Sequence, residues 1–74
     1  MSDVADRVLV LVSSIAGQRS VDVTAQWRAL GMDSLDLLSL VITVEDEFGI
    51  AIPDPVAMTL HCAADVIALL TDRR

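Results

Sequence analysis

The sequence predicts an all-α fold, a small bundle of three main helices with a short helical element in third position. Apolar residues recur at helical spacing in three segments, capping residues or glycines stand at the ends of those segments, and no segment demands a strand. The chain has 74 residues and is 54% hydrophobic, yet it contains one Trp, one Phe and no Tyr. A single domain over residues 1–74 with an aliphatic core is therefore expected. At this length folding buries only about 60% of the surface of the unfolded chain.

The first helix is expected between Asp3, which can serve as its N-cap, and Gly17, which ends it. Its apolar residues recur on one face: Val4, Val8, Leu11, Val12 and Ile15. Residues 17–32 are expected to form a long connection that Trp27 and Leu30 pin to the core. A connection this long in so small a domain is usually functional or well anchored.

The second helix is expected to begin after Asp33 and to run to Phe48, with Gly49 as its stop. Asp33 suits an N-cap, and Asp36 three residues later resembles the partner in a capping box. The core stripe of this helix has the spacing i, i+3, i+4, i+7 and i+11: Leu37, Leu40, Val41, Val44 and Phe48.

Two shorter segments complete the expected bundle. Asp54 followed by Pro55 is typical of a cap and a first helical position, which is enough for one short turn. Thr59 can cap the last helix. The core face of that helix is expected to consist of Ala63, Val66, Ile67 and Leu70.

The second helix also has apolar residues outside its core stripe. These residues are Leu35, Leu38 and Ile42, and at 100° per residue they fall on a separate strip. Glu45 and Asp46 lie near this strip, and Ser34 stands at its N-terminal end. Exposed apolar strips of this kind more often mark a docking surface. The alternative is that a neighbouring helix covers part of the strip.

The charge distribution restricts the partners. The net charge is -6, and eight acidic residues but no Lys or Arg lie between Ala29 and Asp72. Such a surface repels phosphate backbones, which excludes nucleic-acid binding, and attracts proteins with basic patches. No apolar run is long enough to span a membrane, and Asp3 and Asp6 stand where a signal peptide would be basic, so a cytoplasmic location is expected. The single cysteine, Cys62, can form neither an internal disulfide nor a metal cluster alone.

Ser34 has three possible roles. It can be an ordinary first-turn residue, a nucleophile, or a point of attachment. A hydrolytic nucleophile needs a base and an oxyanion hole, but the only histidine is His61 and no GxSxG motif is present. An enzyme is therefore not expected. A serine at a helix start is exposed, and the unpaired N–H groups there tolerate an added phosphate, with Asp33 placed to hold a metal or orient a partner.

The run WRALGMDSL at residues 27–35 resembles the phosphopantetheine attachment signature of acyl carrier proteins. The following LDLLSLVITVEDEFGIAIPD is laid out like the second helix and next loop of that family, and TLHCAADVIALL resembles its last helix. The resemblance covers essentially the whole chain and is most specific in the middle third. It is closest in kind to the discrete bacterial carriers, so residues 1–74 are expected to be one acyl carrier domain.

The resemblance implies that a phosphopantetheinyl transferase moves 4'-phosphopantetheine from coenzyme A onto Ser34, using a divalent metal ion. The thiol of the arm would then hold acyl groups as thioesters. Partner enzymes with basic patches would dock on the second helix: an acyl-loading ligase or transferase, a ketosynthase or other pathway enzymes. The chain is expected to be a monomer. The positions that match the family's attachment and docking residues are Asp33, Ser34, Leu35, Asp36, Ile42, Glu45, Asp46 and Glu47, with Leu38 in the apolar strip.

Some positions depart from the family pattern. Ser39 stands where fatty-acid carriers usually have a docking glutamate, the third helical segment is about one turn shorter, and lysine is absent. These departures favour a carrier for polyketide or related natural-product assembly over a fatty-acid carrier. Asp33 favours an acyl carrier over a peptidyl carrier. An aminoacyl or peptidyl carrier of a nonribosomal-type pathway and an unmodified interaction module are the alternatives.

Overall fold

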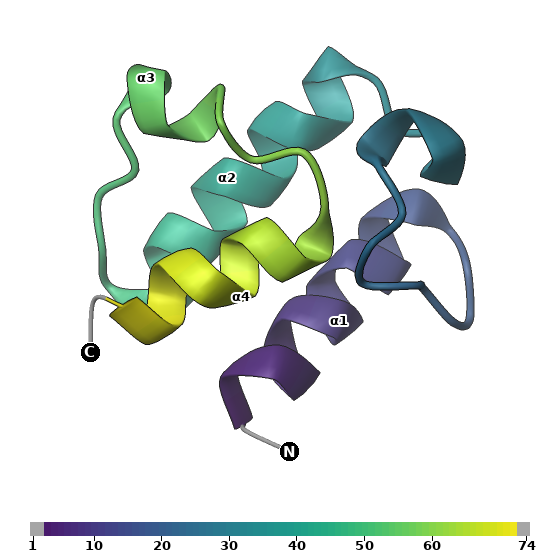
Figure 1. Cartoon of the computed structure of the whole chain (residues 1–74), viewed down its shortest axis with the longest axis horizontal. Helices are drawn as coiled ribbons and strands as arrows, with labels where there is room; N and C mark the ends of the chain where they lie inside the picture. Colours follow the sequence, from purple (N-terminus) through teal and green to yellow (C-terminus); the bar gives the residue numbers. More distant parts are fainter. Residues whose placement is uncertain (1–2, 73–74) are drawn as a thin grey trace.

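The computed structural model describes residues 3–72. Figure 1 shows its helices in chain order: α1 (Asp3–Ala16), the 3-10 helix η1 (Trp27–Leu30), α2 (Ser34–Phe48), α3 (Asp54–Ala57) and α4 (Ala63–Asp72). α1 packs against both α2 and α4. Within the described range the only β-type pairing is an isolated bridge between Gln26 and Cys62, so the all-α fold class is confirmed.

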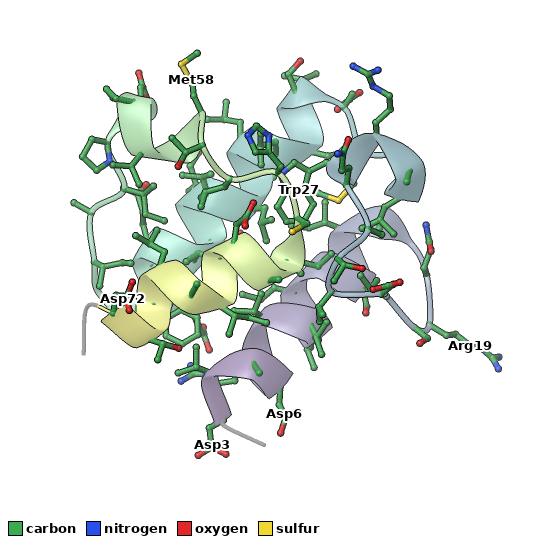
Figure 2. The ribbon with its side chains drawn as sticks, viewed as in Figure 1. Asp3, Asp6, Arg19, Trp27, Met58 and Asp72 are labelled. Atoms are coloured by element: carbon green, nitrogen blue, oxygen red, sulfur yellow. The ribbon has the colours of Figure 1, made fainter. Side chains whose placement is uncertain are left out.

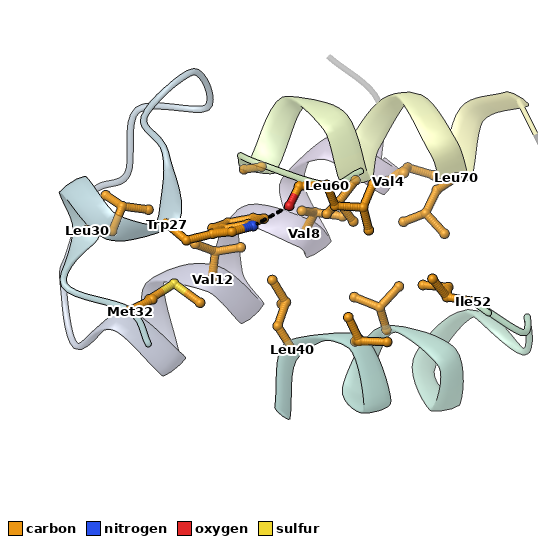
Figure 3. Close-up of a cluster of buried hydrophobic side chains, with 14 residues drawn as sticks. Val4, Val8, Val12, Trp27, Leu30, Met32, Leu40, Ile52, Leu60 and Leu70 are labelled. Carbon is orange, nitrogen blue, oxygen red and sulfur yellow. Dashed lines mark hydrogen bonds between the residues drawn. The ribbon is translucent and has the colours of Figure 1, made fainter. Parts of the chain in front are cut away.

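The core is aliphatic and lies where α1, α2 and α4 meet (Figure 3). Its most deeply buried large side chains come from these three helices: Val8, Val12, Leu40, Val44 and Val66. Burying an aliphatic side chain of this size contributes roughly 1.5–3 kcal/mol. No polar side chain among residues 3–72 is buried, so the hydrophobic effect is the main source of stability. None of the described helices is both long and apolar enough to pass through a membrane.

The ends of α2 lie where the sequence predicts them. Asp33 is the N-cap, and its Oδ1 accepts a hydrogen bond from the Asp36 N–H at 2.9 Å. In return, the Asp33 N–H donates to Oδ2 of Asp36 at 3.3 Å, which completes the capping box. Gly49 ends the helix with φ of 65°, a left-handed conformation that glycine adopts without strain.

Two residues expected to be N-caps, Asp3 and Asp54, lie inside their helices instead. Asp3 is the first described residue of α1, where its negative charge interacts favourably with the helix dipole. The residue before it lies outside the described range. Asp54 is likewise the first residue of α3. The N-cap of α3 is Pro53, which makes no side-chain capping bond. Both acids therefore act through charge in the first turn rather than through a capping hydrogen bond.

The expected start of the last helix at Thr59 is also wrong. The Thr59 hydroxyl donates to the Val56 carbonyl at 2.7 Å, and α4 begins only at Ala63. The N-terminal capping contact comes from inside the helix, because the Asp65 carboxylate accepts the His61 N–H at 2.8 Å. The expected core face of α4 is confirmed. Ala63, Val66 and Leu70 are buried, and Ile67 is partly buried.

The connection over residues 17–32 is anchored as predicted, since Trp27 and Leu30 are both buried. The 3-10 helix η1 within it was not predicted. Earlier in the connection, the backbone N–H and then the hydroxyl of Thr24 donate to Oδ1 of Asp22, and these bonds lower the pKa of the Asp22 carboxyl. The connection is thus ordered by local hydrogen bonds as well as by its apolar anchors.

Candidate functional site

Ser34 is the first residue of α2, and its side chain is exposed. The adjacent Asp33 and Asp36 carboxylates bond to each other's backbone N–H groups, not to the Ser34 hydroxyl. Within residues 3–72 that hydroxyl has no hydrogen-bond partner. The structure therefore presents a hydroxyl that is open to solvent, at a rigidly capped helix start.

The segment leading into Ser34 is fastened to the loop between α3 and α4. The Trp27 indole Nε1–H donates to the Leu60 carbonyl at 2.7 Å (Figure 3), and the Trp27 backbone N–H donates to the His61 carbonyl at 3.1 Å. On the other side, the Gln18 amide donates to the Leu30 carbonyl at 2.9 Å. η1 is thus held by the distant loop between α3 and α4 and by the early part of its own connection, and this fixes where α2 begins.

A sharp turn connects η1 to α2. Gly31 has φ of 76°, in the left-handed region that glycine tolerates best. The next residue, Met32, is buried, and its N–H donates to the Trp27 carbonyl at 3.0 Å. Because the chain enters the core at Met32 and leaves it at Asp33, Ser34 emerges on the surface.

The expected apolar strip on α2 is exposed. Leu35 is 73% exposed, Leu38 is 55% exposed and Ile42 is 56% exposed. No neighbouring helix covers them, which removes the alternative that the strip belongs to the core. The exposure is confirmed, whereas the docking role stays a prediction.

An apolar groove of about 290 Å³ lies beside this strip, between α2 and α3. Ser34 lines it, as do Leu38 and Val41 of α2, Ala57 of α3 and Met58 just after it. Met58 is 78% exposed and points away from the bundle (Figure 2). The groove therefore combines an apolar lining with the candidate attachment point.

A second cleft, of about 440 Å³, adjoins Ser34 on the side of η1. Its walls include Trp27 and Arg28 of η1 and His61 of the loop before α4. No local pattern in the sequence indicates this cleft, because its walls meet through tertiary contacts such as those of Trp27 with Leu60 and His61. In the part of the chain that the structure describes, no three His, Cys, Asp or Glu side chains are grouped to hold a metal ion.

The three consecutive acids near the end of α2 are not equivalent. The Glu45 carboxylate accepts the Ile52 N–H at 2.7 Å and so closes the loop after the helix. Glu47 forms an ion pair with Arg7 of α1, whose guanidinium lies 4.8 Å from the centre of the Phe48 ring. Among residues 3–72 Asp46 alone of the three has no such partner. Asp46 is thus the acid most available to a docking protein.

Replacing Glu45 with alanine is expected to lower the free energy of unfolding by about 1–3 kcal/mol, because the buried Ile52 would be left with an unsatisfied N–H. The matched control is Asp46→Ala, which removes an exposed acid and is expected to change stability by less than about 0.5 kcal/mol. Urea denaturation of both variants measures the difference. Equal stability of the two would show that the Glu45 bond contributes nothing.

A small helical bundle that offers an exposed serine at a capped helix start, beside an apolar groove, defines a class of carrier domains rather than of enzymes. The comparison of the sequence with known families agrees: residues 6–70 match the family model described as "Phosphopantetheine attachment site". The chain belongs to this family, and 4'-phosphopantetheine is its cofactor.

Among curated proteins the chain is similar to the "Acyl carrier protein, mitochondrial" of Dictyostelium discoideum, with 38% identity over 71 residues. The aligned region includes 92% of this chain and 58% of the relative, so the chain spans somewhat more than half of the relative's length. The resemblance to acyl carrier proteins is confirmed, while the discrete bacterial type stays a prediction.

The comparison also corrects one expectation. The cytoplasmic location expected from the sequence is contradicted, because this relative is named as a mitochondrial protein. The expectation relied on the charge and hydropathy of these 74 residues. Those properties reflect the folding and solubility of the domain, and a compartment is not set by them.

Proposed function

We propose that this chain is an acyl carrier whose residues 1–74 form one carrier domain, with 4'-phosphopantetheine attached to Ser34. The observation that carries the proposal is the exposed Ser34 hydroxyl, which has no partner in the described range, at the start of α2 in a chain of the phosphopantetheine family. Asp33 fixes the helix start through Oδ1, and its second carboxylate oxygen stays available to a transferase or to the metal ion of that enzyme.

The attachment is a phosphoryl transfer from coenzyme A, catalysed by a phosphopantetheinyl transferase. The Ser34 oxygen attacks the phosphorus that carries the pantetheine arm, and the serine proton passes to a base of the transferase. A P–O bond to Ser34 forms, the P–O bond inside the pyrophosphate breaks, and adenosine bisphosphate leaves with the electron pair. A divalent ion bound by the transferase offsets the charge that develops. When bound, the arm supplies a terminal thiol that holds acyl groups as thioesters.

The surface around Ser34 supports docking of partner enzymes. The apolar strip of Leu35, Leu38 and Ile42 provides area that partners can bury, and the acids Asp36 and Asp46 lie on the same helix. Basic patches on a loading enzyme or on a chain-extending enzyme would be attracted to this helix. Because Glu45 and Glu47 already have partners inside the chain, the apolar strip is expected to contribute more to affinity than the acids do.

The cargo that we propose is an acyl chain. The groove between α2 and α3 supports this class because its walls are mostly aliphatic, which suits a hydrocarbon tail better than an amino acid. Ser39 on α2 and the four-residue α3 favour polyketide-type assembly over fatty-acid synthesis. Mass spectrometry of the loaded carrier isolated from its source distinguishes the two, since a keto or hydroxyl pattern retained along the chain would indicate the former and a saturated chain the latter.

The proposed function is tested by intact-mass measurement after incubation with coenzyme A, magnesium and a phosphopantetheinyl transferase of broad specificity. We expect the wild-type chain to gain one phosphopantetheine, and peptide mapping to place it on Ser34. A folded chain that gains nothing beside an active transferase on a known carrier would contradict the proposal. It would favour an unmodified interaction module.

Replacing Ile42 with alanine is expected to lower the kcat/KM of acyl transfer from the loaded carrier by about tenfold, the cost of a moderate interface contact. The free energy of unfolding should change by less than about 0.5 kcal/mol, because the Ile42 side chain is more than half exposed. Val10→Ala is the matched control, since Val10 is an apolar residue of α1 with 67% exposure. Equal transfer rates for the two variants would show that the strip is not the docking face.

A further inference from the structure

Two hollows meet at Ser34, and they differ in chemistry. The groove toward α3 is lined mainly by aliphatic side chains. The cleft toward η1 is also lined by polar groups, namely the Gln26 amide, the Arg28 guanidinium, the Asp33 carboxylate and the His61 ring. Its volume of about 440 Å³ falls in the range of small-molecule sites, which is about 300–1,000 Å³. A group attached to Ser34 thus has a choice between an apolar and a polar surface.

Charge distinguishes the two hollows further. Arg28 is the only arginine or lysine that lines either of them, and each hollow is also lined by one aspartate, Asp33 in the cleft and Asp54 in the groove. The other arginines of the described range are placed elsewhere, because Arg7 is paired with Glu47 and Arg19 points away from the bundle (Figure 2). Arg28 itself is exposed and has no ion pair within residues 3–72. The cleft beside the attachment point therefore contains one guanidinium that has no ion pair within the described range.

We propose that the attached arm rests in the cleft toward η1, with its phosphodiester beside Arg28 and its amide groups against Gln26 and His61. This inference rests on the proposed attachment at Ser34. A phosphodiester on Ser34 is anionic and lies next to the Asp33 carboxylate, which repels it. Arg28 offsets that repulsion from the side of the cleft.

The polarity of the arm favours the same cleft. The attached arm contains two amide groups and one free hydroxyl that need hydrogen-bond partners, so an aliphatic groove is a poor site for it. The inference therefore concerns the arm before an acyl group is joined to its terminal thiol.

The test compares the amide NMR spectra of the chain with and without the arm, in the wild type, Arg28→Gln and Arg19→Gln. In the wild type, attachment is expected to shift the backbone signals of Gln26, Arg28 and His61, with little change at Ala57 and Met58. These shifts are expected to be lost in Arg28→Gln and retained in Arg19→Gln, which removes an equal charge outside the cleft.

The outcomes separate this inference from the proposed function. Complete modification by mass, with signal changes limited to α3 and the immediate neighbours of Ser34, overturns the resting site and leaves the carrier function intact. Retention of the Gln26 and His61 shifts in Arg28→Gln overturns the role of Arg28. Failure of the wild type to gain the arm overturns both. The wild-type comparison needs no variant, so the position of the arm is tested even if Arg28→Gln is a poor transferase substrate.

Discussion

Ser34→Ala is expected to lose all gain of phosphopantetheine while the bundle stays as stable as the wild type. The variant has no oxygen to form the phosphodiester, so the loss should be complete rather than partial. Stability should hold because the Ser34 side chain is exposed and makes no hydrogen bond within the described range. The Asp33–Asp36 capping box does not involve the hydroxyl, and alanine has the higher helix propensity.

Ser39→Ala is the matched control for this variant, because Ser39 is a second exposed serine on α2. It is expected to be modified like the wild type. Intact mass measures the modification, and thermal unfolding followed by circular dichroism measures stability. A mass gain that persists in Ser34→Ala would place the attachment on another residue. A fall in stability beyond about 0.5 kcal/mol would instead give Ser34 a structural role.

Trp27→Ala is expected to destabilise the fold by about 3–5 kcal/mol, the usual cost of truncating a buried aromatic side chain. Trp27 is only 8% exposed, and its indole N–H donates to the Leu60 carbonyl. A core in a chain below about 70–80 residues rarely supplies more than about 3–5 kcal/mol in total. The variant is therefore expected to be largely unfolded at room temperature, as measured by circular dichroism in urea.

Trp27→Phe separates the hydrogen bond from the packing. It keeps an aromatic ring in the core but leaves the Leu60 carbonyl without its donor, so a smaller loss of about 1–3 kcal/mol is expected. Leu38→Ala serves as a surface control, because Leu38 is 55% exposed. Equal stability of Trp27→Ala and Leu38→Ala would show that Trp27 does not anchor η1.

The parts of the fold that follow from short-range signals were predictable. α2 begins and ends where its cap residue and glycine indicate, because Asp33, Asp36 and Gly49 act on backbone groups within a few residues. The start of α4 was not predictable in the same way. After the local turn at Thr59, the Leu60 and His61 carbonyls accept hydrogen bonds from Trp27, which is more than thirty residues away in sequence, and no local pattern indicates these bonds.

The same distinction applies to the site. The exposure of Ser34 and of the apolar strip on α2 follows from helical spacing alone. The ion pair of Glu47 does not follow from helical spacing, because its partner Arg7 is 40 residues away on α1. The cleft that places Arg28 and His61 beside Ser34 also arises only when two distant loops meet. Local patterns thus locate the proposed attachment point, whereas tertiary contacts decide which charges remain available around it.

The position of Trp27 has a practical consequence. The chain has one tryptophan and no tyrosine, so nearly all of its near-ultraviolet absorption and emission comes from this indole. The indole is bonded to the loop before α4 and also lines the cleft beside Ser34. Its fluorescence is therefore expected to report both the integrity of the bundle and the arrival of a group in the cleft. The proposed modification could then be followed optically in the unlabelled protein.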